Sequence, residues 1–293
     1  MARSISENHL DAYKSGFLKR LFDGIKEDPE LSFEIRLNDT VIVYYRKSKI
    51  LETTINRRGI SKVTMLNPNF YKDTTKPSVD LSNPENLKSL TLIRKYFREA
   101  KKLIYKYKMG KEFEVQQHIA LGNQSFDGKY LVVDMEWGFS QAELPSIERI
   151  PRTRIDLVIV DTKFNSDGFN DIYLAELKVG TDATDGESGI IDHVEKTHKI
   201  IEKEKACNSI INDVQAIIAQ KERLGLITGE PKNFRFAKKP KMMLILGYRS
   251  EDEKDTLYDD AEKAKAKAKV LGMEPPVCMM YNMLIRLDDL ENV

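Results

Sequence analysis

Three charged residues interrupt two apolar runs between residues 155 and 180, and this conflict constrains the fold more than any other feature of the sequence. The runs "IDLVIV" and "IYLAELKV" are typical of buried strands. Asp156 opens the first run, and Glu176 and Lys178 interrupt the second. Because a charge inside an apolar strand is costly unless it is paired or bound to a metal, the three charges require a common explanation.

The connection between the two runs, "FNSDGFND", contains an Asp-Gly pair, which favours a hairpin. Side chains alternate along a strand, so Glu176 and Lys178 point to the same face. Antiparallel pairing brings Asp156 roughly opposite the end of the second strand, near Lys178. Two carboxylates can bind a hard cation, and a lysine can orient a water or stabilise developing negative charge. This combination of two carboxylates and a lysine suits metal-assisted phosphodiester hydrolysis.

The N-terminal part of the sequence predicts a small α+β module over residues 1–80 that binds substrate or partner. Residues 8–26 have the apolar spacing of an amphipathic helix, and residues 31–66 alternate in short β-like runs with a turn at Asn38-Asp39. The following segment is rich in Pro, Asn, Asp, Ser and Thr, which indicates a linker and a domain boundary at about residues 75–85.

The rest of the chain, residues 85–293, predicts an α/β domain with a mixed sheet. A helix is expected to start at Asn83-Pro84, because proline is favoured at the first helical position. Gly225 is a plausible helix end. The expected helices are 84–108, 111–123, 190–225 and 252–272, and the expected strands are 129–139, 154–161, 171–180, 241–250 and 276–287. Short connections predict that the first three strands pair antiparallel.

The pair "RID" and "ELK" on the two strands of this hairpin resembles the PD-(D/E)xK nuclease superfamily. The superfamily has a restriction-endonuclease-like αβββαβ core, which matches the predicted order over roughly residues 111–250. The resemblance implies that Asp156 and Glu176 bind Mg²⁺ or Mn²⁺, helped by the main-chain carbonyl of Leu177, and that Lys178 positions the attacking water. Ile155 replaces the proline of the family pattern.

A closer similarity is to the catalytic domain of archaeal-type flap and mismatch endonucleases. There a helix begins with a glutamate and has a glutamine one turn later, and a strand with a second glutamate follows. Glu112, Gln116, Ile119 and Glu136 fit those places. The similarity implies that Glu112 completes the metal site.

Several accessory positions follow from the same similarity. Glu114 is the alternative to Glu112 if the register differs by two residues, and Glu136 is a further metal-proximal acid. Relatives often carry a polar residue on the helix after the third strand. His193 and Lys196 are candidates for that place, with Gln215 a more distant one.

A purely structural role is the alternative explanation for several of these residues. Glu176 and Lys178 alone would also fit a cross-strand ion pair at a sheet edge. Glu112 and Glu114 would fit exposed acids favoured by the helix dipole. His193 would fit a surface residue at a helix start. The nuclease interpretation rests on the full set of three charges together with the hairpin and the order of elements.

A basic helix at residues 88–111 predicts a DNA contact. Tyr96 and Tyr105 are interleaved with its cations, and Arg57-Arg58-Gly59 is a possible second phosphate contact. The alternative is a solvated outer face over an apolar stripe. The residues expected to contact DNA are Arg94, Lys95, Arg98, Lys101 and Lys102.

Overall charge does not identify a partner, because 47 basic and 46 acidic residues give a net charge of +1. Cys207 and Cys278 allow no disulfide framework or zinc spacing, which predicts a reducing, cytoplasmic compartment. No signal peptide or membrane helix is expected. The resulting expectation is an endodeoxyribonuclease in DNA repair or defence against foreign DNA. Many such enzymes are homodimers, which makes a homodimer a further expectation. An inactive nuclease-fold binding module and an RNA-cleaving enzyme are the alternatives.

Overall fold

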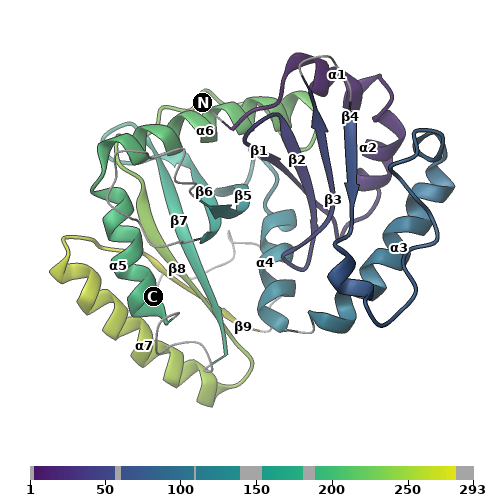
Figure 1. Ribbon diagram of the computed structural model, residues 1–293. Coiled ribbons are helices and arrows are strands. Elements are labelled where there is room, and N and C mark those ends of the chain that lie inside the picture. Colours follow the sequence, from purple (N-terminus) through teal and green to yellow (C-terminus); the bar gives the residue numbers. More distant parts are fainter. Residues whose placement is uncertain (1–2, 57–60, 109, 139–153, 181–188, 282–293) are drawn as a thin grey trace. The chain divides into compact units, whose positions relative to one another are not determined.

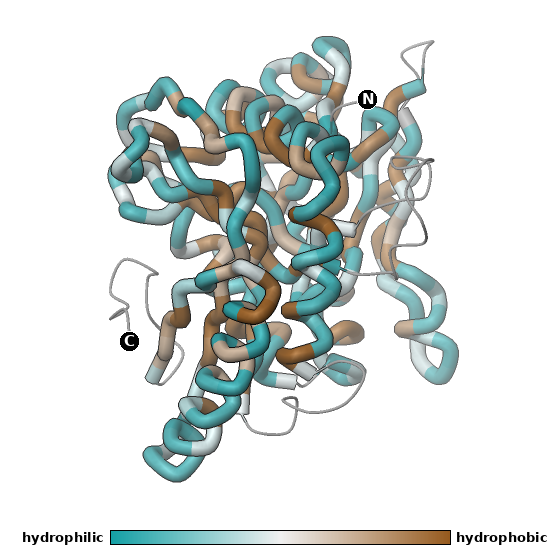
Figure 2. Tube along the Cα trace, turned by 90° about the vertical axis from the view of Figure 1, so that its left-hand side faces the viewer, coloured by the Kyte–Doolittle hydropathy of each residue, from teal (hydrophilic) through white to brown (hydrophobic). Residues whose placement is uncertain are grey.

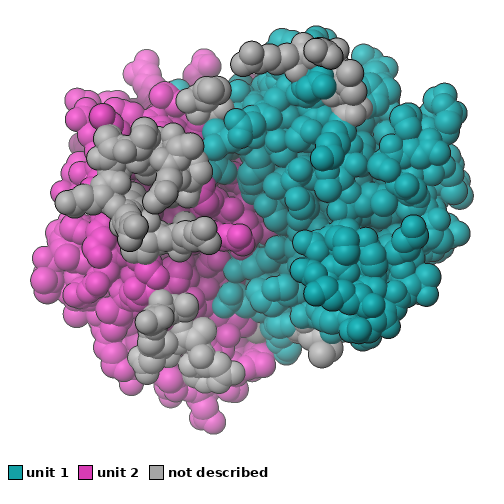
Figure 3. Space-filling model, in the orientation of Figure 1, with its two compact units in different colours: residues 1–117, 215–227 teal, residues 118–214, 228–293 magenta. Residues whose placement is uncertain are grey.

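The computed structural model describes residues 3–56, 61–108, 110–138, 154–180 and 189–281. Over these residues the protein has an α/β fold with two sheets, one antiparallel and one mixed, as the sequence predicts (Figure 1). The chain forms two compact units (Figure 3). Unit 1 contains residues 1–117 and 215–227, and unit 2 contains residues 118–214 and 228–293.

Unit 1 is built on a four-stranded antiparallel sheet in the order β1-β2-β3-β4. Its strands are β1 Ser32–Arg36, β2 Thr40–Tyr45, β3 Ser48–Ile55 and β4 Ser61–Met65. Its helices are α1 Glu7–Lys14, α2 Lys19–Lys26, α3 Leu90–Tyr107 and the short 3₁₀ helices η1 Pro68–Tyr71 and η2 Asn86–Lys88.

The helix predicted over residues 8–26 is two helices, because the chain turns at residues 15–18. The backbone N–H groups of Ser15 and Gly16 both donate to the Asp11 carbonyl, which ends α1. A side chain at Gly16 would place its Cβ only 2.9 Å from the Ala12 Cα, so glycine permits this close turn. The apolar spacing continues across the break, which explains why the pattern suggested one helix.

Two turns of the unit 1 sheet, β1–β2 and β2–β3, have positive φ angles. Asn38 and Asp39 adopt φ of 59° and 54°, which confirms the predicted turn. A second such turn, at Arg46 and Lys47 with φ of 48° and 58°, lacks the usual Asn or Gly and was not predicted. The sequence gives no signal for it, because these side chains are held by contacts with distant residues, described below.

The helix predicted to start at Asn83-Pro84 begins instead at Leu90, where the Ser89 hydroxyl accepts a hydrogen bond from the Leu92 N–H. This helix, α3, packs on the antiparallel sheet. The Tyr96 hydroxyl donates to the Ile50 carbonyl at 2.7 Å. The division between the units therefore falls near residue 117, and not at the boundary expected at 75–85.

Unit 2 is built on a five-stranded mixed sheet in the order β5-β6-β7-β8-β9. The first three strands pair antiparallel, as predicted, and β7, β8 and β9 pair parallel. The strands are β5 Tyr130–Gly138, β6 Arg154–Phe164, β7 Asn170–Val179, β8 Lys241–Tyr248 and β9 Val277–Tyr281. Residues 282–287 of the last predicted strand lie outside the described residues.

Four helices accompany this sheet along the chain. They are α4 Lys111–Gly122, α5 Ile190–Ile201, α6 Glu204–Arg223 and α7 Glu251–Val270. The helix predicted over 190–225 is thus two helices, α5 and α6. Gly225 follows α6 with φ of +65°, which confirms the predicted helix end. Helices α4 and α6 each contribute residues to both units.

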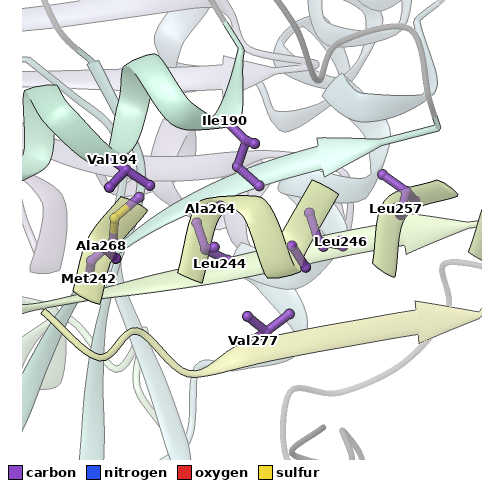
Figure 4. Packing of buried hydrophobic residues seen from close by; sticks show 10 residues of the cluster. Ile190, Val194, Met242, Leu244, Leu246, Leu257, Ala264, Ala268 and Val277 are labelled. Atoms are coloured by element: carbon purple, nitrogen blue, oxygen red, sulfur yellow. The ribbon is translucent and has the colours of Figure 1, made fainter. Parts of the chain in front are cut away.

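Helices α5 and α7 cover one face of the mixed sheet (Figures 1 and 4). Met242, Leu244 and Leu246 alternate along β8 and pack against Ile190 and Val194 of α5. On the outer side α7 is rich in Lys, Asp and Glu, and the helix is largely teal in Figure 2. Helices α5 and α7 therefore share an apolar core with β8.

Candidate functional site

The β6–β7 hairpin brings the first two predicted site residues together. Leu157 pairs with Ala175, so Asp156 and Glu176 occupy the next row of the antiparallel ladder. The Asp156 Oδ2 accepts a hydrogen bond from the Leu177 N–H at 3.0 Å. Asp156 thus lies beside Glu176, two rows nearer the turn than the expected position near Lys178.

Glu176 is the centre of a buried charged cluster. Its residue exposure is 4%, and that of Lys178 is 6%. The Lys178 Nζ lies 2.9 Å from the Glu176 Oε1, and the His193 Nδ1 lies 2.9 Å from the Oε2. Both carboxylate oxygens therefore have a partner, which is the requirement for a charge buried in an apolar sheet.

The electrostatics of this cluster are unfavourable for the Glu176 carboxylate. Burial raises the pKa of Glu176, and the nearby charge of Asp156 raises it further. The hydrogen bond from His193 and the positive charge of Lys178 act in the opposite direction without cancelling the shift. A positive charge added close to both carboxylates would relieve this repulsion.

Helix α5 positions His193 over the sheet. The helix begins at Ile190, and the His193 N–H donates to the carbonyl of Gly189. Ile190 and Val194, three residues before and one after His193, are buried against β8. Glu176 of β7 pairs in register with Leu244 of β8. Its side chain therefore lies on the same face of the sheet as Leu244, which is the face that α5 covers. His193 therefore contacts Glu176 and is not merely an exposed helix-start residue.

Glu136 lies in the same row of the sheet on the other side of Asp156. Met135 pairs with Leu157 and Trp137 with Ile155, which places Glu136 opposite Asp156. Glu136 has φ of 57° and its carboxylate contacts the Arg154 Nη1 at 3.3 Å. A backbone irregularity between residues 132 and 134 precedes it in β5.

The described residues contain no ready-made cluster of three His, Cys, Asp or Glu side chains that could hold a metal ion. Glu136 of the Asp156 row contacts Arg154, and the neighbouring carboxylates of Asp156 and Glu176 have the backbone of Leu177 beside them. This set resembles the requirement of Mg²⁺, which binds one or two carboxylates and keeps several waters.

Glu112 and Glu114 are both in the first turn of α4 and belong to unit 1. The Glu112 Oε1 lies 3.3 Å from the Lys47 Nζ, and the Glu114 Oε2 lies 2.6 Å from the Arg46 Nη2. These pairs hold the unpredicted β2–β3 turn. A role of Glu112 or Glu114 in a metal site stays a prediction.

Other residues of the endonuclease-like pattern have structural contacts. Gln116 and Ile119 are buried in α4. The Lys196 side chain pairs with Asp192, one turn earlier on α5. Gln215 is exposed on α6.

The five cations of α3 expected to contact DNA differ in their surroundings. Arg94 pairs with Glu27 at 2.5 Å, and Lys101 lies 2.8 Å from Asp28 and 2.6 Å from Glu30. Lys95 approaches Glu99 at 4.0 Å, and Arg98 and Lys102 are exposed. Three of the five positive charges are thus partly neutralised within unit 1.

Tyr96 was expected beside those cations, but it is a core residue with an exposure of 0%. Its hydroxyl bonds two backbone groups of unit 1, so its ring is not available to a base. Tyr105 is 51% exposed and lies under the Arg46 guanidinium at 4.6 Å. Arg57, Arg58 and Gly59 lie outside the described residues.

No helix within the described ranges is long and apolar enough to cross a membrane. No family model and no curated protein matches the chain. One similar solved structure is that of SfsA from Pyrococcus furiosus in complex with Ca²⁺. The two chains are 8% identical, and the match covers 90% of this chain and 87% of that chain with a TM-score of 0.22. The buried cluster of Asp156, Glu176, Lys178 and His193 is therefore the basis for assigning a function.

Proposed function

We propose that this protein is a metal-dependent nuclease that hydrolyses DNA phosphodiester bonds at the Asp156–Glu176 row. The observation that carries the proposal is the pair of carboxylates on adjacent strands, with Lys178 2.9 Å from Glu176 and both residues buried. A sheet does not gain stability from two neighbouring buried acids. Such an arrangement is a common feature of functional sites.

Asp156 and Glu176 would hold Mg²⁺ or Mn²⁺, together with the carbonyl of Leu177. The Leu177 N–H donates to Asp156, and the N–H and C=O of one residue in a strand point to the same side. The Leu177 carbonyl therefore points toward Asp156. When bound, the divalent ion would supply positive charge for the phosphate oxygens.

Lys178 would act on the attacking water. Its ammonium group is held 2.9 Å from the carboxylate of Glu176, a proposed metal ligand. A cation there lowers the energy of negative charge on the incoming oxygen. His193 would be a positioning residue, because it fixes the second oxygen of Glu176.

DNA repair and defence against foreign DNA are the settings that this activity suggests. The proposed enzyme would act in the cytoplasm with DNA as its partner. The cations of α3 would contribute to DNA binding as the sequence predicts. An RNA substrate is tested alongside DNA, because a nuclease site of this type does not identify the sugar.

A specific observation favours a second candidate, an inactive binding module with a nuclease-like fold. Lys178 and His193 together engage both oxygens of Glu176. A degenerate site neutralised by its own cations would look the same, and it would bind no metal.

Cleavage of plasmid, single-stranded and branched DNA, and of RNA, in Mg²⁺, Mn²⁺ or EDTA separates these candidates. The informative variants are Asp156→Asn and Lys178→Met. The matched control is Asp260→Asn on α7, because Asp260 is also a buried acid, 3.0 Å from Lys263. Metal-dependent cleavage that is lost in both variants and kept in the control would support the nuclease. The absence of cleavage on every substrate, with no metal binding by calorimetry, would favour the binding module.

A further inference from the structure

Two exposed phenylalanines occupy the turn end of the β6–β7 hairpin, at the opposite end of these strands from the Asp156–Glu176 row. Phe164 ends β6 and is 60% exposed, and Phe169 directly precedes β7 and is 43% exposed. Contiguous exposed apolar surface on a soluble protein commonly marks an interaction site. The question is which partner such a surface would accept.

A second segment of chain, residues 232–238, lies beside this hairpin end. The Asn170 N–H donates to the Arg235 carbonyl at 2.6 Å, and the Ala237 N–H donates to the Asn170 carbonyl at 3.1 Å. Phe164 pairs with Asn170 in the sheet, and Asn170 forms a bridge with Phe236. Phe164 and Phe236 therefore belong to one row across three neighbouring segments.

A third ring extends this row. Phe234 and Phe236 stack with their ring planes 9° apart and their centroids 5.6 Å apart. Both side chains are partly exposed, and Phe234 also contacts the buried Phe126 with a centroid distance of 6.0 Å. The flat rings are thus supported from below while part of their surface faces solvent.

The backbone beneath these rings is fixed by two asparagines. The Asn170 side chain is buried, donates to the carbonyls of Asp161 and Lys163, and accepts from the Arg235 N–H. The Asn165 Oδ1 accepts hydrogen bonds from two N–H groups of the hairpin loop, one of them that of Phe169. Because the backbone is already ordered, a ligand that binds here loses little affinity to ordering this part of the chain.

Positive charges alternate with the phenylalanines. Residues 230–241 contain five Lys or Arg residues and one acid, Glu230. Lys239 pairs with Glu202 and Lys241 with Asp171. The three remaining cations are all exposed, and they are Lys232, Arg235 and Lys238.

We propose that this hairpin-end surface binds single-stranded nucleic acid. Exposed flat rings with interleaved cations match a strand whose bases are unstacked, because bases stack on the rings and phosphates contact the cations. Bases within a duplex are already stacked and do not reach such rings. The residues of the surface are Phe164, Phe234, Phe236, Lys232, Arg235 and Lys238.

Binding is tested by the fluorescence anisotropy of a labelled 20-nucleotide oligo-dT in EDTA, where no metal-dependent cleavage occurs. Failure of the proposed nuclease activity therefore leaves this result unchanged. The double variant of Phe164→Ala and Phe236→Ala should weaken binding by about tenfold or more, which corresponds to about 1.4 kcal/mol. Phe164→Tyr should keep the affinity, since the flat ring remains. Tyr258→Ala on α7, at a residue 43% exposed, is the control and should have no effect.

The charge contribution is measured separately by the salt dependence. Replacing Lys232 and Lys238 together by glutamine should reduce the slope of log affinity against log salt by about 1.4, given about 0.7 for each phosphate contact on a single strand. Circular dichroism verifies that every variant is folded. Phe164 is largely exposed, so its replacement should not unfold the protein.

Four results would overturn the proposal. The first two are the absence of oligo-dT binding at 50 mM salt and an unchanged affinity of the Phe164/Phe236 double variant. The other two are an affinity for a 20-base-pair duplex equal to that for oligo-dT, and full affinity of Phe164→Leu, which keeps an apolar side chain without a ring. If light scattering shows a dimer that Phe164→Ala dissociates, and oligo-dT does not bind, the surface is a contact between two copies of the chain.

Discussion

Replacing Lys178 by methionine should destabilise the metal-free protein by about 3 kcal/mol at pH 8. The variant keeps the aliphatic length of the side chain but removes the ammonium group 2.9 Å from the Glu176 carboxylate. Breaking a buried ion pair by removing one partner costs roughly 3–5 kcal/mol, because the remaining charge stays buried. Both side chains are less than 10% exposed, so solvent screens this loss little.

Two features of the structure place the cost at the lower end of that range. His193 still bonds the Glu176 Oε2 at 2.9 Å in the variant. The carboxyl group can also take up a proton, because burial and Asp156 already raise the pKa of Glu176. Protonation removes the buried charge, so the destabilisation should be smaller at pH 5.5 than at pH 8.

Trp137 provides the assay. It is the single tryptophan of the chain, it is 1% exposed, and it lies in β5 of unit 2. Its fluorescence therefore reports the unfolding of the unit that contains the site. With a slope of about 2 kcal/mol per molar urea, a loss of about 3 kcal/mol lowers the urea midpoint by about 1.5 M.

Divalent ions should partly replace the missing lysine charge if the proposed metal site exists. Mg²⁺ at one hundred times its dissociation constant would stabilise the folded protein by about 2.7 kcal/mol. The gain in Lys178→Met should be at least as large as in the wild type, whereas Asp156→Asn should lose it. A Lys178→Met variant whose urea midpoint in EDTA matches the wild type at pH 8 would refute the reasoning about the buried pair.

Three further predictions concern two buried contacts of unit 1 and the pH dependence of stability. Lys221→Met should lower the free energy of unfolding of unit 1 by about 3 kcal/mol, because Lys221 lies 2.9 Å from Glu34 and both are almost fully buried. Urea unfolding followed by circular dichroism measures this change, and a loss under about 1 kcal/mol would contradict the prediction. Tyr96→Phe should cost about 1–3 kcal/mol in the same assay, since the change leaves two buried backbone groups without the hydroxyl partner. In EDTA, the wild type should lose stability as the pH rises from about 4.5 through the raised folded-state pKa of Glu176, and Glu176→Gln should flatten that dependence; identical pH profiles would contradict the burial of the charge.

The alternation of residues along the strands was enough to predict much of unit 2. Side-chain alternation and the Asp-Gly turn predicted the antiparallel β6–β7 hairpin, and the structure confirms that pairing. Local signals also predicted the turn at Asn38-Asp39 and the helix end at Gly225, because positive φ angles are restricted to few residue types. These features depend on interactions between residues close in sequence.

The errors in the helices arise from contacts that no local pattern records. The break at residues 15–18 and the late start of α3 at Leu90 interrupt segments whose apolar spacing is continuous. The β2–β3 turn at Arg46-Lys47 depends on Glu112 and Glu114, more than sixty residues away. The position of Tyr96 in the core likewise depends on a sheet formed by residues 32–65.

The sequence by itself determined that Asp156, Glu176 and Lys178 would lie together, because a hairpin and the two-residue period of a strand fix their relative positions. Only the tertiary structure decided what surrounds them. The packing of α5 on β8 places His193 against Glu176, and the pairing of β5 with β6 places Glu136 opposite Asp156. Helix docking and strand order depend on burying apolar surface contributed by segments far apart in the chain, and a single sequence does not specify that register locally.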